Sequence, residues 1–130
     1  MRRAGRGEPG VGRVSPAPLD IRVEQLKDAA GTVVVTPSGE IDYSEAPVFR
    51  EALRRVSEGR PAKLIVDLSR VAYMNTPGVA TLVEALQLAK KNKTRLVLAG
   101  LTERVSAVFD IARLTRVFEI APDRNAAIAR

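Results

Sequence analysis

Apolar positions follow two spacings along this chain, and the two spacings alternate. Short β-branched and aliphatic runs are typical of strands, whereas apolar residues that recur every three or four positions are typical of amphipathic helices. Gly, Pro and Asp clusters separate the runs and indicate turns. The predicted elements, in order, are strands 21–26 and 32–36, helix 48–56, strand 63–68, helix 79–89, strand 95–100, helix 105–112, strand 117–120 and helix 123–129.

This order of elements predicts an α/β fold with a mixed, mostly parallel sheet of about five strands and about four helices, because parallel strands need helical crossovers. The pattern leaves open whether all the helices lie on one face. Pro37 and Gly39 interrupt the second strand and indicate either a bulge or a sheet edge. If strand 32–36 lies at an edge, it could pair between two copies of the chain and form a homodimer.

The chain has 130 residues, a length that favours one domain. Its charged residues are distributed unevenly. Lys and Arg number 21, Asp and Glu 15, and the net charge is +6. Residues 1–18 hold four arginines and one glutamate among Gly and Pro, so we expect a disordered basic tail there and a folded domain at 19–130. The domain itself carries 17 basic and 14 acidic residues, a balance that favours a protein partner over nucleic acid.

The chain contains neither Cys nor His, which excludes thiolate nucleophiles, Ser-His-Asp triads and the usual zinc ligands. Glu40 and Asp42 are best interpreted as a solvent-facing strand end and a helix cap, and Gly78 lacks the Gly and Lys partners of a phosphate-cradling loop. We therefore expect no enzyme, no catalytic residue, no metal and no cofactor. No apolar run is long enough to span a bilayer or to form a secretory signal, which predicts a cytoplasmic protein without direct membrane insertion.

The segment between strand 63–68 and the next helix is the most unusual part of the sequence. It follows the carboxyl end of a strand, where open α/β sheets bind ligands and partners. Thr76 followed by Pro77 predicts a helix N-cap with proline at the first helical position. The Thr76 hydroxyl would lie at the positive end of a helix, where a phosphate is tolerated, but a purely structural cap explains the same residues.

Four stretches in this order resemble bacterial STAS domains of the anti-sigma-factor antagonist family. They are Gly39-Glu40-Ile41-Asp42, Leu64 to Ser69, Tyr73 to Val79 and Leu114 to Ile120, and the resemblance covers residues 19–129. Family members carry Asp-Ser-Ser-Gly or Asp-Ser-Thr-Gly where this chain has Asn75-Thr76-Pro77-Gly78. Asn75 thus replaces an acidic residue, and Pro77 replaces a second hydroxyl residue and removes a backbone donor.

The resemblance implies a binding switch. Its partner would be an anti-sigma factor that is a serine/threonine kinase of histidine-kinase-like fold, and the kinase would phosphorylate Thr76 and thereby release the domain. An alternative is a cytoplasmic STAS subunit that docks on the ATPase of a bacterial lipid-transport ABC complex without phosphorylation. Residues expected to contact the partner are Asp42, Ser44, Asn75, Thr76, Pro77, Gly78, Thr81 and Glu84, with Thr81, Glu84 and Ala85 on the surface of the helix.

Overall fold

The computed structural model describes residues 19–130, so the predicted basic tail lies outside the described residues. The α/β class and all nine predicted elements are confirmed, and a sixth strand, β5, is added. The elements are β2 (Asp20–Gln25), β3 (Thr32–Ile41), α1 (Ala46–Glu58), β4 (Lys63–Asp67), β5 (Val71–Met74), α2 (Thr76–Asn92), β6 (Arg95–Ala99), α3 (Glu103–Ile111), β7 (Glu119–Ala121) and α4 (Arg124–Ala129).

The sheet is mixed and mostly parallel, as predicted. Its strand order is β2-β3-β4-β6-β7, and β2 is antiparallel to β3 while the other neighbours are parallel. β5 pairs with the second half of β3, beyond the end of β4. Of the two alternatives left open for strand 32–36, the sheet edge is excluded, because β3 runs between β2 and β4. Within the described residues, β2 and β7 form the two ends of the strand order.

A bulge lies where Pro37 and Gly39 led us to expect an irregularity. The register between β3 and β5 shifts between Gly39 and Glu40, and Gly39 has a φ of 126°, which favours glycine. The Gly39 N–H donates to the Arg70 carbonyl at 3.0 Å, so the bulge remains hydrogen-bonded to the neighbouring chain segment. Gly39 is opposite Val71 and Glu40 is opposite Tyr73, so the additional residue of the bulge is Ala72 of β5.

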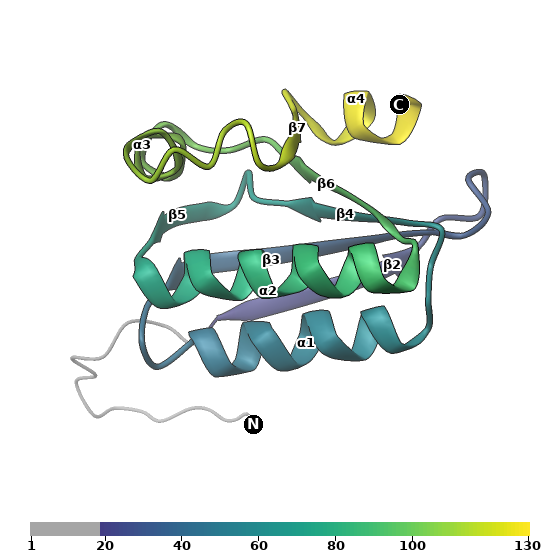
Figure 1. Cartoon of the computed structure of the whole chain (residues 1–130), viewed down its shortest axis with the longest axis horizontal. Coiled ribbons are helices and arrows are strands. Elements are labelled where there is room, and N and C mark those ends of the chain that lie inside the picture. The colour runs from purple at the N-terminus through teal and green to yellow at the C-terminus, as the bar shows by residue number, and fades with distance from the viewer. Residues whose placement is uncertain (1–18) are drawn as a thin grey trace, which may run out of the picture.

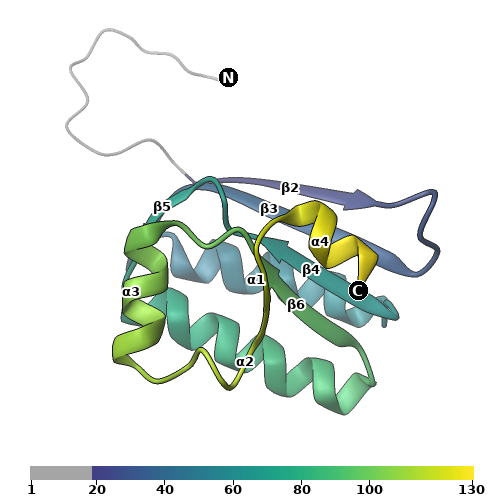
Figure 2. The same ribbon diagram turned by 90° about the horizontal axis from the view of Figure 1, so that it is seen from above.

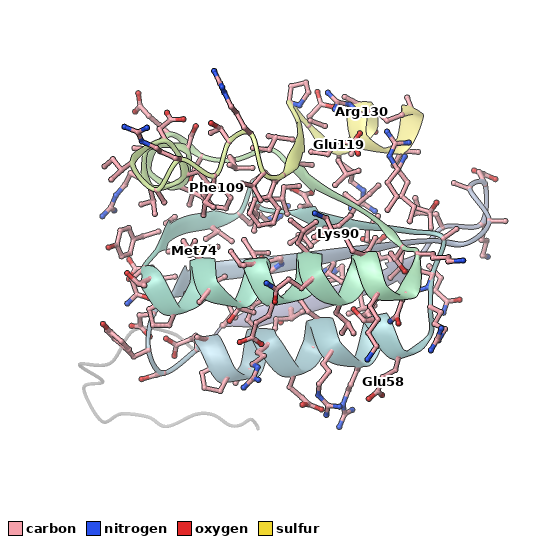
Figure 3. The ribbon with its side chains drawn as sticks, viewed as in Figure 1. Glu58, Met74, Lys90, Phe109, Glu119 and Arg130 are labelled. Atoms are coloured by element: carbon pink, nitrogen blue, oxygen red, sulfur yellow. The ribbon has the colours of Figure 1, made fainter. Side chains whose placement is uncertain are left out.

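Helices cover both faces of the sheet (Figures 1 and 2). α1 and α2 lie side by side on one face and α4 lies on the other, which settles the question that the sequence left open. β4 shows the resulting alternation, since Leu64 and Val66 pack under α1 and α2 while Ile65 packs under α4. Figure 3 labels Met74 of β5 and Phe109 of α3, which belong to the same core as α1 and α2.

The helix starts differ in detail from the predictions. α1 has Glu45 as its N-cap rather than a residue of the segment 42–44. α2 has Asn75 as its N-cap, so Thr76 is the first helical residue. The helix predicted at 105–112 starts at Glu103, with Thr102 as its N-cap. The Thr102 hydroxyl donates to the Val71 carbonyl at 2.9 Å and does not cap its own helix. This bond fastens the beginning of α3 to β5.

The last strand starts at Glu119, two residues later than predicted. Val117 and Phe118 belong to a turn, because the N–H groups of both donate to the Leu114 carbonyl. The turn places the Phe118 ring against Phe109 with a centroid distance of 5.6 Å. Phe118 therefore packs in the core from a turn, whereas Val117 beside it remains 48% exposed.

Candidate functional site

Two loops that are far apart in sequence lie side by side at one end of the sheet. Ile41, the last residue of β3, is opposite Met74, the last residue of β5. The Asn75 N–H donates to the Ile41 carbonyl at 3.1 Å, which ties the start of α2 to the end of β3. The structure thereby brings the predicted site residues Asp42 and Ser44 next to the segment 75–78.

Thr76 is exposed at the first position of α2. Asn75 before it is extended, with φ −101° and ψ −173°, and its carbonyl accepts the first helical hydrogen bond from Val79 N–H at 3.1 Å. Within residues 19–130 neither side chain caps the helix by a hydrogen bond, so the prediction of a Thr76 cap is wrong. Its hydroxyl faces solvent at the positive end of a 17-residue helix.

Gly78 is buried rather than exposed, and its lack of a side chain has a packing reason. A Cβ added there would lie 2.5 Å from Met74 Cγ and 2.9 Å from Ile41 Cγ2, closer than side-chain atoms can approach. The glycine lets the first turn of α2 press against the ends of β3 and β5. The close packing at Gly78 therefore fixes the position of the Thr76 loop relative to β3 and β5.

The outward face of α2 differs from the predicted one. Thr81 and Ala85 were expected at the surface, and this expectation is wrong, since each is only 5% exposed. α2 packs against α1 as well as the sheet, and the Thr81 hydroxyl donates to the Pro77 carbonyl at 2.9 Å inside the helix. The exposed stripe that continues from Thr76 consists of Ala80, Glu84 and Gln87.

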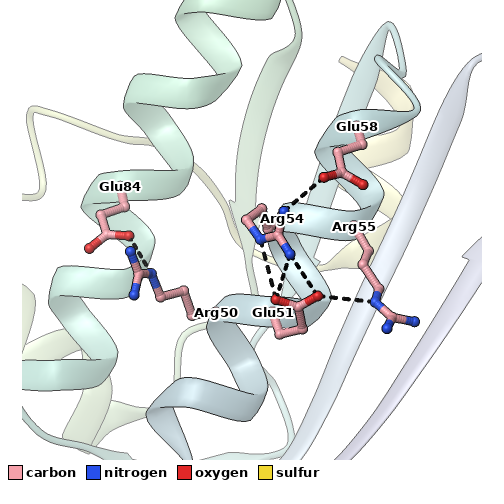
Figure 4. Close-up of polar contacts among 6 residues, drawn as sticks. All are labelled: Arg50, Glu51, Arg54, Arg55, Glu58 and Glu84. Carbon is pink, nitrogen blue, oxygen red and sulfur yellow. Dashed lines mark hydrogen bonds and ion pairs between the residues drawn. The ribbon is translucent and has the colours of Figure 1, made fainter.

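Sequence reasoning named Glu84 of this stripe and missed Ala80 and Gln87. The available signal was the helical spacing itself, because positions four, eight and eleven residues after Thr76 share its face. Glu84 reaches across to α1, where Arg50 Nε lies 2.8 Å from its Oε1 (Figure 4). Both side chains are more than half exposed, so this ion pair is weak, and a partner protein can replace it with a contact of its own to Glu84.

Acidic side chains border the site on the β3 side. The Ser44 N–H donates to Asp42 Oδ1 at 3.0 Å. A hydrogen bond with Glu45 lowers the pKa of Asp42, and the same bond, with burial and the charge of Asp42, raises the pKa of Glu45. The negative charge of Glu40 raises the pKa of Glu45 further. The rim next to Thr76 is therefore acidic, and Glu45 takes up a proton before Asp42 as the pH falls.

A basic side chain borders β5 on the other side of the site. The Arg104 guanidinium of α3 stacks on the Tyr73 ring at 4.8 Å from its centroid. Tyr73 alternates with the buried Met74, so its ring points outward from the sheet. The site thus presents the exposed Thr76 between an acidic rim and a stacked arginine.

Neither a metal-binding cluster nor a membrane-spanning helix occurs among the described residues. Across 19–130, no three acidic side chains converge to hold a metal ion. None of the helices in that part of the chain is long and apolar enough to cross a membrane. Asp67 accepts the Ser69 N–H at 3.0 Å and holds the chain between β4 and β5.

The sheet with its covering helices and the exposed loop at its end define a small α/β domain that offers a surface to other molecules. The STAS domain family matches residues 21–127, and the chain belongs to this family. The resemblance noted in the sequence is confirmed.

Three comparisons describe what the chain is similar to. An anti-sigma-B factor antagonist from Bacillus subtilis is 34% identical over 103 residues, which cover 79% of this chain and 93% of the relative. The crystal structure of an anti-sigma factor antagonist from Mycobacterium paratuberculosis has a TM-score of 0.77 at 24% identity, covering 85% of this chain and 92% of that one. The structure of the Bacillus cell fate determinant SpoIIAA in its phosphorylated form has a TM-score of 0.67 at 19% identity. The match covers 85% of this chain and 98% of that one.

Proposed function

We propose that this chain is a non-enzymatic binding module of the cytoplasm that acts as an anti-sigma factor antagonist. Its partner is an anti-sigma factor that is also a serine/threonine kinase of histidine-kinase-like fold. The unmodified domain binds this kinase through the Thr76 loop and the exposed stripe of α2, and phosphorylation of Thr76 ends the binding. The single observation that carries this proposal is the exposed Thr76 hydroxyl at the start of α2.

The surroundings of Thr76 suit a phosphate-controlled contact. The N-terminus of a helix stabilises negative charge, so a phosphate on Thr76 does not break α2. The Ile41–Asn75 hydrogen bond and the close packing at Gly78 hold the loop in place whether or not it is modified. The added charge of about −1.5 to −2 therefore acts on the partner, not on the fold.

The acidic rim gives the switch its direction. Asp42 and Glu45 already make one side of the site negative. A phosphate next to these two carboxylates adds further negative charge. Burying that charge at an interface without a matching cation is unfavourable. The name of the B. subtilis relative and the phosphorylated form of SpoIIAA support both parts of the proposal, antagonism of an anti-sigma factor and control by phosphate.

Binding of the full chain to the anti-sigma-factor kinase of the same organism, measured by isothermal titration calorimetry, tests the proposal. Thr76→Ala is expected to retain binding, whereas Thr76→Glu weakens it by at least about tenfold. Thr115→Glu is the matched control, because Thr115 is also exposed but lies between α3 and β7. Equal affinity of Thr76→Glu and Thr76→Ala would refute the switch.

The kinase reaction provides a second readout. After incubation with the kinase and ATP, the intact mass of the chain is expected to rise by about 80 Da, the mass of one phosphoryl group, and Thr76→Ala is expected to abolish the shift. Pro77, which stiffens the loop and removes a backbone donor, favours the alternative of docking on an ABC ATPase without modification. An unmodified chain that captures such an ATPase instead of a kinase would establish that alternative.

A further inference from the structure

β2 is an edge strand whose outer side has no neighbour within the described residues. Figure 2 shows β2 at the border of the sheet, with β3 on one side of it. Val23 in the middle of this strand is 49% exposed, unusual for a branched apolar residue at the centre of a strand. An edge of this kind is a template for pairing with another strand.

The hydrogen bonding of the hairpin fixes which backbone groups of β2 point outward. The Leu26 N–H donates to the Thr32 carbonyl at 3.0 Å, so Leu26 faces β3. Backbone direction alternates along an antiparallel strand, and the β2–β3 register contains no irregularity. It follows that the N–H and C=O groups of Ile21, Val23 and Gln25 point away from the sheet.

We propose that a second copy of this chain binds this edge, with the two β2 strands antiparallel and Val23 of one protomer opposite Val23 of its partner. Backbone geometry permits several registers, in each of which outward residues face one another. In the proposed register, Arg22 of each protomer lies opposite Glu24 of the other. Shifts by one two-residue step place Arg22 opposite Arg22, or Glu24 opposite Glu24, and like charges in such pairs are unfavourable.

Both charged residues are available for this contact. Arg22 is exposed and makes no ion pair with any of residues 19–130. Glu24 is bound on one side by Arg124 at 2.9 Å, and its side chain remains 37% exposed. A carboxylate can accept two guanidinium groups, as Glu119 does in this structure from Arg95 and Arg130.

The opposite face of the strand supplies the apolar part of the contact. Ile21 and Val23 line a shallow groove with Val48 and Val56 of α1, and Val48 is 54% exposed. α1 packs over β3, so three strand spacings, about 14 Å, separate the two α1 helices of the pair. This exceeds the spacing of about 8–10 Å at which helices pack, so the helices flank the joined strands without collision.

Sedimentation equilibrium of the full chain tests the proposal by its dependence on concentration. The wild-type chain is expected to reach twice the monomer mass at high concentration. Arg22→Glu and Glu24→Arg each oppose like charges twice and are expected to weaken the dimer by at least about tenfold. A mixture of the two variants restores both opposite-charge pairs and is expected to dimerise, a result that misfolding of either variant cannot produce.

Cysteine cross-linking tests the register in a chain that has no cysteine of its own. Val23→Cys places two sulfurs across a hydrogen-bonded pair with Cα atoms about 5.5 Å apart, within disulfide range. Gln25→Cys is the matched control, because the two copies of residue 25 lie four residues apart along the strands, about 14 Å. We expect only the Val23→Cys variant to form a disulfide-linked dimer rapidly on oxidation. A wild-type chain that stays monomeric, or equal cross-linking of both variants, would overturn the proposal.

Discussion

Replacement of Gly78 by alanine is expected to destabilise the domain, although alanine is the better helix former. The added Cβ would lie 2.5 Å from Met74 Cγ and 2.9 Å from Ile41 Cγ2. Met74 is flexible and can move aside. Ile41 cannot, because its Cγ2 is attached directly to a β-branched carbon in a fully buried strand residue. The first turn of α2 must therefore shift away from β3.

The magnitude follows from two opposing effects. Overpacking of a core costs about 1–3 kcal/mol, and glycine to alanine in a helix gains up to about 1 kcal/mol. We expect a net loss of about 1–2 kcal/mol in the free energy of unfolding. For a domain near 100 residues, each kcal/mol lowers Tm by about 4–8 °C, so the change is readily measured by thermal circular dichroism.

Gly59→Ala is the matched control for this substitution. Gly59 ends α1 with φ −75°, and an added Cβ would meet no atom closer than the Val56 carbonyl oxygen at 3.4 Å. The same methyl there is expected to be neutral or to stabilise by about 0.4–1 kcal/mol. Met74→Ala should relieve part of the strain, so Gly78→Ala is expected to cost less in that background. A Gly78→Ala variant as stable as the wild type would refute the packing argument.

Two further predictions concern ion pairs and the last helix. The hydrogen bond from Arg95 lowers the pKa of Glu119 below its ordinary value of 4.5. The ion pair of Arg95 and Glu119 therefore stabilises the folded state fully above pH 4.5, and this stabilisation is lost as the pH falls through the lowered pKa of Glu119. Glu119→Gln is therefore expected to lower Tm at pH 7, and its difference from the wild type is expected to shrink as the pH falls below 4.5, whereas a constant difference would contradict the linkage. Lys63 Nζ donates to the Ile128 carbonyl at 3.2 Å, so Lys63→Met is expected to speed amide exchange in α4 more than in α2; unchanged exchange in α4 would contradict that role.

The order of nine elements could be predicted from the sequence because each of these elements has a local period of apolar residues. β5 could not be predicted, since only Val71 and Met74 of its four residues are buried and their spacing is not the alternation that is typical of a strand. This strand exists because the second half of β3 extends beyond β4 and needs hydrogen-bond partners. That need is non-local, and no pattern within positions 71–74 expresses it.

The outward face of α2 was predicted incorrectly for a related reason. Thr81 is polar, which suggested the surface, but its hydroxyl is satisfied by a carbonyl of its own helix and can therefore be buried. Ala85 is small, and the contact with α1 uses that small size to bring two helices together. The position of Thr76 at the start of α2 could be predicted because Pro77 marks a helix start, whereas its role as the N-cap was predicted incorrectly, since Asn75 is the N-cap.

In the proposed dimer, the position of β2 relative to the Thr76 loop leaves the proposed partner contact accessible. Asp20 at the start of β2 lies opposite Ser38, so the start of β2 is at the same end of the sheet as the Thr76 loop. In an antiparallel β2 pair, the two starts lie at opposite ends of the joined sheet, and so do the two Thr76 loops. Each loop is then free to bind its own partner. Arg22→Glu should therefore abolish the dimer and leave the affinity of the Thr76 site unchanged.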